Sequence, residues 1–399
     1  MRGISSGILT VTAIILIVEI LGYLGIIQLV GTKIRKIKVS LLYWLLTSLV
    51  LSCWLMAFFD PDKIRRTTDY SFFYFVIFIS TLNFFPKFLF SVFVIFAAPF
   101  RFFKRNRQSQ VVLLSGLILS LGMILIMGYG LIAGKRTIRT EEVKLTLSSL
   151  PAGLNGLKIV QISDLHLGSF ESDRFLSSAV ERINRIEPDL ILFTGDIVNN
   201  YHQEMDGFDD QLKQLKAGLG KYAILGNHDY GDYTDWSSPV VKEQNFSLIM
   251  KKIRKSGFKL LLNQSEQILV HGTQLYLIGV ENWGHGSFPR YARLDSALAH
   301  VPDSSFRILM THDPAHWDQQ VVSQTSIPLT LSGHTHGGQF ALKLAGIEFS
   351  PIRFVGKRWG GLYQEGEQFL YVNRGFGCVG LPARIDMDPE ISVFTLFRK

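Results

Sequence analysis

Two histidines alternate with small residues in the stretch GHTHGGQ, which occupies residues 333–339. Glycine on either side lets the backbone turn sharply, so His334 and His336 can bring their imidazoles to neighbouring positions. The stretch directly follows an apolar run at 328–331, which is typical of a buried strand. It therefore indicates a ligand-bearing loop at the carboxyl end of a strand.

Four further polar clusters close apolar runs upstream in the same way. Each alone is a weak signal, but five in one chain are hard to attribute to chance. Ligand sites in open α/β sheets form at the carboxyl ends of strands, so we expect all five clusters to converge on one site. The four are Asp164 with His166 after 157–163, Asp196 after 189–194, Asn227 with His228 and Asp229 after 222–225, and His312 after 306–311.

The side chains in these clusters are carboxylates, an amide and imidazoles. Such oxygen and nitrogen ligands suit Mn, Fe, Zn or similar divalent ions. They are too many for one ion. Two ions roughly 3.5–4 Å apart need a bridging carboxylate, and such a pair clamps the oxygens of a phosphoryl displacement. The two cysteines, Cys53 and Cys378, exclude a disulfide framework and a cysteine-based zinc site.

In this order, the clusters resemble those of the calcineurin-like metallophosphoesterases. The form GHTHGGQ resembles the subgroup that carries an amino-terminal transmembrane region, and the tail at 370–375 and 380–382 also looks like that subgroup. The resemblance covers about 157–339. It implies an α/β four-layer sandwich, with two mixed sheets flanked by helices, and two divalent metal ions (Mn, Fe or Zn, with Mn favoured).

The resemblance also implies a role for each residue of the site. A hydroxide between the two ions would attack phosphorus, and His228 would protonate the leaving group as general acid. Asp229 would either orient His228 or cap a helix, and the sequence leaves both alternatives open. The first ion would be held by Asp164, His166 and His336, the second by Asn227, His312 and His334, and Asp196 would bridge the two.

The first third of the chain consists of long apolar runs. Four segments, at 4–30, 39–59, 70–100 and 111–133, reach the roughly 20 residues that a transmembrane helix needs. The third contains Pro86, and we predict one kinked helix there rather than two short passes. Residues 1–139 are therefore predicted to be an all-α transmembrane domain of about four helices. Residues 140–399 are predicted to be the phosphoesterase domain.

The basic residues are distributed as membrane flanks. Residues 1–139 hold 16 Lys/Arg against 4 Asp/Glu, whereas residues 140–399 hold 25 against 29. This division argues against nucleic-acid binding by the folded domain. The short loops carry eight Lys/Arg on one side and seven on the other. That small bias predicts a multi-pass protein of the cytoplasmic (inner) membrane with an extracytoplasmic catalytic domain.

One acidic residue, Glu19, lies near the middle of the first predicted span. An ionisable group in that position is costly and often functional. The alternative is a carboxyl group bonded to a neighbouring helix, and this is the interpretation that we favour.

Two segments bear on substrate binding. The loop 281–294 contains Trp283, Arg290 and Arg293, which could bind a phosphate with a base or sugar, or could form an ordinary surface loop. The stretch 342–362 mixes aromatic and basic residues. It suits a membrane surface or a lipid head group, or alternatively strands with basic outer faces.

These features predict a membrane-anchored hydrolase of phosphodiesters or pyrophosphates. Lipids are among its candidate substrates. Some membrane-bound relatives of the subgroup cleave UDP-2,3-diacylglucosamine in lipid A synthesis, and that pyrophosphatase is the specific alternative. That reaction needs a cytoplasmic active site, whereas the loop charges predict an extracytoplasmic one. A transporter or sensor with a regulatory phosphoesterase-like domain is a third hypothesis, but four spans with few polar residues make a poor translocation path.

Overall fold

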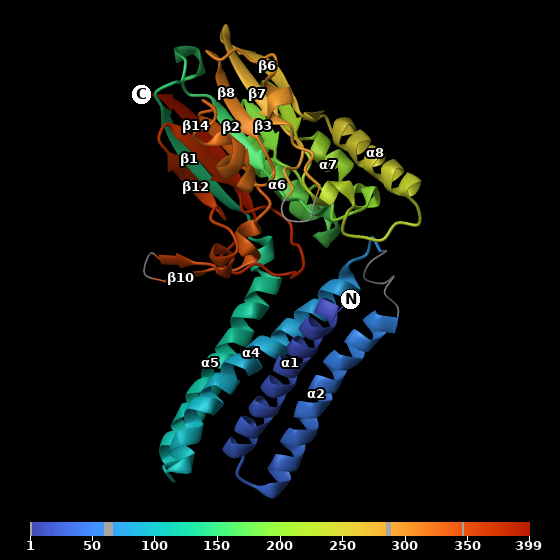
Figure 1. Ribbon diagram of the computed structural model, residues 1–399, viewed down its shortest axis with the longest axis vertical. Coiled ribbons are helices and arrows are strands. Elements are labelled where there is room, and N and C mark those ends of the chain that lie inside the picture. Colours follow the sequence, from blue (N-terminus) through green and yellow to red (C-terminus); the bar gives the residue numbers. More distant parts are fainter. Residues whose placement is uncertain (1, 60–66, 285–288, 345–346) are drawn as a thin grey trace. The chain divides into compact units, whose positions relative to one another are not determined.

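The computed structural model describes residues 2–59, 67–284, 289–344 and 347–399 (Figure 1). The chain forms two compact units. One comprises Met1–Thr67 and Ser71–Tyr129, and the other comprises Thr68–Tyr70 and Gly130–Lys399. Lys63, Arg65 and Arg66, which enter the loop charges counted above, lie outside the described residues.

The first unit is built from long apolar helices. They are α1 (Arg2–Leu29), α2 (Lys33–Phe59), α4 (Ser71–Phe102) and α5 (Asn106–Ile132), and each is long and apolar enough to cross a membrane. Among the described residues, the predicted all-α domain of about four long apolar helices is therefore confirmed. Helix α4 runs through Pro86 and Pro99 without a break, so the third segment is one helix.

Glu19 on α1 is bonded to neighbouring helices. Its Oε2 lies 2.7 Å from Nζ of Lys87, with which it forms an ion pair, and it also accepts from Thr47 Oγ1 at 3.0 Å. Its Oε1 accepts from Asn83 Nδ2 at 2.8 Å. The cluster joins α1, α2 and α4, as the second interpretation of Glu19 supposes.

The second unit contains two six-stranded mixed sheets. In the first, β2, β3, β4 and β5 run parallel, and β14 inserts antiparallel to β2 while pairing parallel with β1. The order is β1 (Arg139–Leu147), β14 (Glu390–Arg398), β2 (Lys158–Ile162), β3 (Leu190–Phe193), β4 (Gly220–Ala223) and β5 (Lys259–Leu260).

In the second sheet, four central strands run parallel and the two edge strands are antiparallel to their neighbours. Its order is β12 (Gly361–Glu365), β13 (Gln368–Val372), β9 (Leu329–Ser332), β8 (Phe306–Met310), β7 (Thr273–Gly279) and β6 (Gln264–Val270). A separate two-stranded sheet consists of β10 (Leu342–Leu344) and β11 (Ile347–Phe349).

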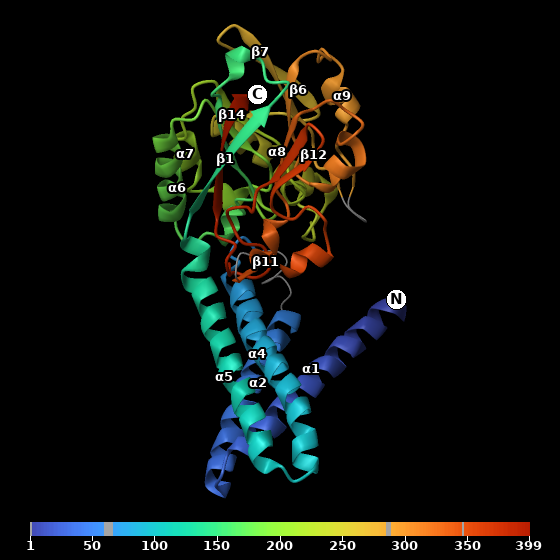
Figure 2. The same cartoon turned by 90° about the vertical axis from the view of Figure 1, so that its left-hand side faces the viewer.

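Three apolar cores separate four layers. One core lies between the sheets and includes Ile159, Leu192 and Leu331. The second lies between the first sheet and the helices α6 (Asp173–Ile186), α7 (Asp209–Lys213) and α8 (Pro239–Lys255). The third lies between the second sheet and α9 (Leu294–Leu298). Figure 2 shows α6 and α7 on one flank and α9 on the other. The predicted four-layer α/β sandwich is therefore confirmed.

Candidate metal centre

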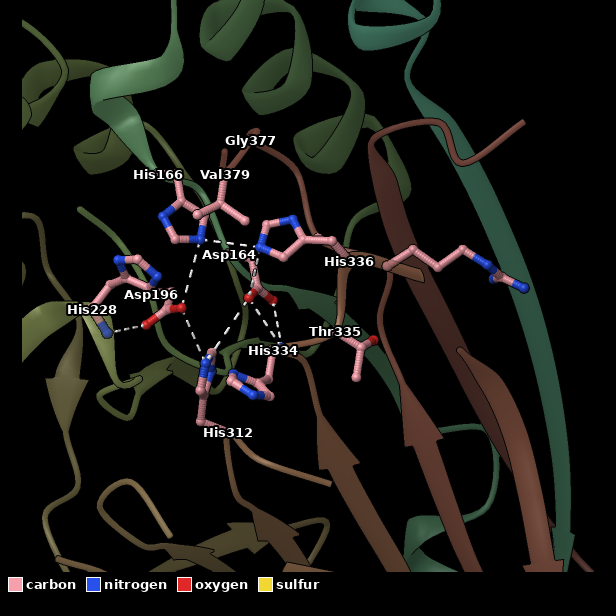
Figure 3. A network of polar contacts seen from close by, with 12 residues as sticks. Asp164, His166, Asp196, His228, His312, His334, Thr335, His336, Gly377 and Val379 are labelled. Carbon is pink, nitrogen blue, oxygen red and sulfur yellow. Dashed lines mark hydrogen bonds and ion pairs between the residues drawn. The ribbon is translucent and has the colours of Figure 1, made fainter. Parts of the chain in front are cut away.

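The five polar clusters meet at the carboxyl ends of the central strands of both sheets. Asp164 and His166 follow β2, Asp196 follows β3, and His312 follows β8. His334 and His336 follow β9, and Asn227 and His228 lie in the loop after β4. Figure 3 shows the aspartate and histidine side chains of this set directed toward one another. Strands from two sheets converge here because the sheets pack face to face with the same ends together.

One group of ligand atoms consists of Asp164, His166 and His336, all buried. The Nε2 atoms of the two imidazoles lie 3.1 Å apart, and Asp164 Oδ1 lies 3.4 Å from Nε2 of His336. Nδ1 of His166 has no hydrogen-bond partner among the residues that the structure describes. Two ring nitrogens so close together repel each other through their lone pairs unless a proton or cation lies between them, so this donor set fits a metal ion.

Asp196 lies between this group and a second one. Its Oδ2 is 3.6 Å from His166 Nε2 and 3.1 Å from His312 Nε2. The second group consists of Asp196, His312 and His334, and Asp196 also belongs to a third with His166 and His228. One carboxylate therefore reaches imidazoles on both sides, which is the arrangement that a bridging ligand requires.

Asn227 completes the second side. Its Oδ1 lies 3.0 Å from Nε2 of His312 and 2.8 Å from Nδ1 of His334. Its Nδ2 donates to the hydroxyl of Tyr233 at 2.7 Å, so the oxygen is the atom turned toward the histidines. An amide oxygen and two imidazoles are suitable ligands for a borderline divalent ion.

The backbone of the site is strained. Asp164, His166, Asp196, His334 and His336 all have positive φ, between 41° and 74°. The left-handed region is unfavourable for residues with a Cβ atom, and such strain concentrates at functional sites. Glycine neighbours permit the close approach that results. A Cβ atom on Gly333 would lie 2.3 Å from Asp164 Oδ2, and one on Gly226 would lie 2.2 Å from Asp196 Oδ1.

Burial and charge shift the pKa values of the site in opposite directions. Burial raises the pKa of Asp164 to about 6 and lowers the pKa of His166 to about 3. Burial also opposes the charge on His312, but the carboxylates of Asp196 and Asp164 outweigh it and raise its pKa to about 10. Carboxyl and imidazole groups with strongly shifted pKa values thus lie within a few ångströms of one another, which is typical of a site that favours cations.

His228 is held at the edge of the site with one ring nitrogen fixed. Its Nδ1 lies 2.8 Å from the carbonyl oxygen of Asn199, which can only accept, so Nδ1 carries a proton. Its ring stacks on Tyr233 at 4.1 Å and meets the ring of His166 edge-on at 4.8 Å. The partly exposed ring is thus left with Nε2 available for proton exchange.

The structure places Asp229 differently from both predicted alternatives. Its Oδ2 accepts from the backbone N–H groups of Asp196 and Gly226, each at 2.9 Å, and its Oδ1 accepts from Ile197. The ring of His228 is oriented by Asn199 instead. Asp229 therefore holds the strained backbone around Asp196, because a carboxylate can satisfy several clustered N–H groups at once.

Sequence reasoning missed two buried charged residues that support the site. Arg384 is fully buried, and its Nη2 lies 3.1 Å from Nδ1 of His336. Glu204 accepts from the backbone N–H of Asn199, whose carbonyl fixes His228. The position of Arg384 between apolar residues in the stretch GLPARIDM was the available sequence signal for its burial.

Of the three residues predicted to contact substrate, Trp283 and Arg290 lie beside the loop that carries His312. Trp283 stacks on His316 at 4.6 Å, and the guanidinium of Arg290 covers the Trp283 ring at 4.7 Å. The backbone N–H of Arg293 donates to Asn263 at 2.8 Å. His316 in turn contacts Thr311, the residue before His312. Their role in substrate binding stays a prediction.

Comparison with known proteins is consistent with this geometry. Residues 157–338 match the family described as calcineurin-like phosphoesterase. Residues 2–135 match the family described as probable calcineurin-like phosphoesterase, transmembrane domain.

Individual relatives match over more than half of the chain. The metallophosphoesterase YkuE of Bacillus subtilis is 35% identical over 265 residues, which are 65% of this chain and 85% of that protein. The phosphodiesterase YaeI of Escherichia coli is 31% identical over 60% of this chain and 82% of that protein. A Danio rerio transmembrane protein with metallophosphoesterase domain is 28% identical over 73% of this chain and 63% of that protein. Among solved structures, a dimetal phosphatase from Danio rerio aligns at 14% identity with a TM-score of 0.31, covering 56% of this chain and 88% of that one.

Proposed function

The chain belongs to the calcineurin-like phosphoesterase family, and on that premise we propose that it hydrolyses phosphodiesters or pyrophosphates with two divalent metal ions, manganese being favoured. The proposal takes residues 140–399 as the catalytic domain and 1–139 as its membrane anchor. The observation that carries it is the position of Asp196 Oδ2, 3.6 Å from His166 Nε2 and 3.1 Å from His312 Nε2. A shared carboxylate between two sets of imidazoles is what a pair of ions needs.

Each ion receives a ligand set drawn from both sheets. In this assignment Asp196 is the bridging ligand. The grouping of ligand atoms within 4.8 Å of one another supports it. Asp164, His166 and His336 hold the first ion, and Asn227, His312 and His334 hold the second.

The chemistry divides between the metal ions and the protein. When bound, two such ions polarise phosphoryl oxygens and lower the pKa of the attacking water. His228 delivers a proton from Nε2 to the leaving oxygen, because its Nδ1 proton is engaged by the carbonyl of Asn199. Asp229 and Arg384 keep Asp196 and His336 in place.

Removal and return of metal tests the proposal. The full chain in detergent, stripped with a chelator, should lose hydrolysis of bis-(p-nitrophenyl) phosphate and regain it with Mn²⁺, with two ions retained per chain. A stripped sample of Asp303→Asn should behave identically, since Asp303 is fully exposed. No hydrolysis of a diester, monoester or pyrophosphate with any of Mn²⁺, Fe²⁺ or Zn²⁺ would contradict it.

A nucleotide–lipid pyrophosphate such as UDP-2,3-diacylglucosamine is a narrower candidate substrate. The exposed aromatic and basic residues that follow His336 favour an amphipathic molecule. The side of the membrane on which the catalytic domain lies distinguishes this substrate from the broader proposal. A reporter that is active only outside the cytoplasm, fused to Lys399, should be active if the proposed extracytoplasmic placement is correct. An inactive reporter would make the nucleotide–lipid the leading candidate.

A further inference from the structure

A small hairpin and the turn after it expose large apolar side chains. Strands β10 and β11 form a sheet of their own, and the turn at Pro351–Phe354 follows directly. Phe354 and Val355 are 77% and 84% exposed, and Leu342 is 47% exposed. Phe349 lies with its ring 6.0 Å from that of Phe354. A contiguous apolar surface of this kind marks a contact with another molecule or with a membrane.

The base of the hairpin is bonded to the end of a membrane span. The backbone N–H of Arg384 donates to the carbonyl of Gly130 at 3.1 Å, and that of Ala341 donates to Ile385 at 2.8 Å. A Cβ atom on Gly130 would lie 2.5 Å from Ile385, so glycine permits this close packing. Gly130 lies inside the candidate span Asn106–Arg136 but belongs to the phosphoesterase unit.

The height of this junction along the span is informative. Gly130 precedes Lys135, the first charged residue after the apolar run, by five residues, which is roughly 7 Å of helix. Ala341 is bonded to the residue next to Arg384, and Leu342 follows it. The base of the hairpin is therefore bonded, through Arg384 and Ile385, to a residue that precedes the charged end of the candidate span by five positions.

Basic residues accompany the exposed apolar ones. Arg353 and Lys357 are exposed, and the guanidinium of Arg353 lies 5.8 Å from the Phe349 ring. Residues 342–357 contain three basic side chains against one acid, Glu348, which lies 3.7 Å from Lys343. Apolar and aromatic residues flanked by cations are the composition of segments that lie in the interface of anionic membranes.

We propose that Leu342, Phe349, Arg353, Phe354, Val355 and Lys357, here called the hairpin patch, rest on the surface of an anionic bilayer. Continuity with the span selects a membrane rather than a protein as the partner. The docking stands whether or not the site hydrolyses phosphoesters.

The hairpin patch is coupled to the loop of the metal centre. Ser350 Oγ donates to the carbonyl of Gly337 at 3.0 Å, and a Cβ atom on Gly338 would lie 2.9 Å from Ile352. Both glycines follow His336 directly. In a docked hairpin, only the short segment 337–341 would separate His336 from Leu342, the first residue of the hairpin patch. A phosphate group on a lipid could then reach the site while the lipid stays in the membrane.

Depth-dependent quenching on the full chain tests the docking. Cys53 and Cys378 are replaced by Ala, and a single cysteine at Val355→Cys or, separately, Phe354→Cys carries a fluorophore. In vesicles of phosphatidylcholine and phosphatidylglycerol with spin-labelled lipid, we expect roughly twofold or greater quenching, as for a group buried at the head-group boundary. Leu269→Cys, 62% exposed on β6, is the matched control and should keep its fluorescence. Figure 1 shows β6 at the end of the phosphoesterase unit away from β10.

The outcomes separate cleanly. Leu125→Cys, 75% exposed on the α5 span, must be quenched for the assay to report on lipid. If it is quenched while labels at both 354 and 355 are not, the proposal is overturned. Arg353→Glu with Lys357→Glu should weaken quenching at 355 in phosphatidylglycerol vesicles. Equal quenching in that variant would overturn the role assigned to anionic lipid.

Discussion

Each unit of this protein buries one cluster of charged and polar side chains, and the two clusters differ in how completely they satisfy themselves. In the membrane unit, both oxygens of Glu19 accept hydrogen bonds, and Lys87 supplies the opposite charge. The positive and negative charges balance within three helices. A cluster of this kind stabilises one packing arrangement of the helices, and its carboxylate oxygens are already bonded to protein groups rather than to a ligand.

The cluster in the phosphoesterase unit is incomplete by the same criteria. His166 Nδ1 finds no partner in the part of the chain that the structure describes, and Nε2 of His166 faces Nε2 of His336. The carboxyl groups of Asp164 and Asp196 lie among them with opposite shifts in pKa. The difference teaches that burial alone does not mark a functional site. Unsatisfied burial combined with strained backbone does.

Of all the changes considered, removing the carboxylate that we propose to bridge the two ions should have the largest effect. Asp196→Asn keeps the shape of the side chain but removes the charge that both ions would share. We expect a loss of about 10,000-fold in kcat/KM on bis-(p-nitrophenyl) phosphate, since ligands to one centre act as a unit. Metal content per chain, measured by mass spectrometry, should fall as well. Near-normal turnover would show that Asp196 is not shared, with Asp303→Asn as the control.

His228, the proposed proton donor, can be replaced without replacing any of the proposed metal ligands. His228→Asn should lower kcat by roughly 100- to 10,000-fold. The loss should shrink for a substrate with a highly acidic leaving group, because such a group leaves without a proton. Metal content should stay at the wild-type level. An equal loss for good and poor leaving groups would contradict the role of His228 as general acid.

Substitutions in the Glu19 cluster of the membrane unit should lower the stability of the protein and leave its catalytic rate unchanged. Lys87→Met leaves the Glu19 carboxylate buried without a counter-charge, which costs about 3 kcal/mol or more of unfolding free energy. Adding Glu19→Gln should restore much of it, because both charges are then gone. Thermal unfolding in detergent measures this, with the exposed Lys104→Met as the matched control. A large change in kcat with unchanged stability would show that the membrane cluster is functional.

His316 is a buried histidine outside the candidate metal centre, and its ring nitrogens are both hydrogen-bonded, like the oxygens of Glu19. Thr311 and Gln320 bond both nitrogens of His316, and burial lowers its pKa to about 4 from 6.5. The unfolded chain thus binds this proton more tightly than the folded one. The stabilisation is complete above pH 6.5 and is lost as pH falls toward 4, by roughly 3 kcal/mol.

The difference in unfolding free energy between wild type and His316→Gln, followed from pH 7 to pH 4, measures the His316 contribution. His300→Gln, at an exposed position, is the matched control. A constant difference across the range would mean that the pKa of His316 is the same in the folded and unfolded states, and would contradict the lowered pKa.

Local sequence determined a great deal of this protein. Run lengths predicted four spans, because a membrane requires each helix to be apolar over its whole length. Short apolar runs ending in Asp164, Asp196 and His312 predicted strands with ligands at their ends. Those ligands meet because parallel strands present the same end to one side of a sheet. The four-layer fold followed from the resemblance that these clusters carry.

Only the tertiary structure decided how the ligands are held. The guanidinium of Arg384 reaches His336 from 48 residues away. Asp229 binds the backbone around Asp196, and β14 inserts between β1 and β2. The hairpin after His336 is likewise joined to the end of α5 through Arg384. None of these contacts leaves a local pattern, because each depends on segments far apart in sequence that only the packing of two sheets brings together.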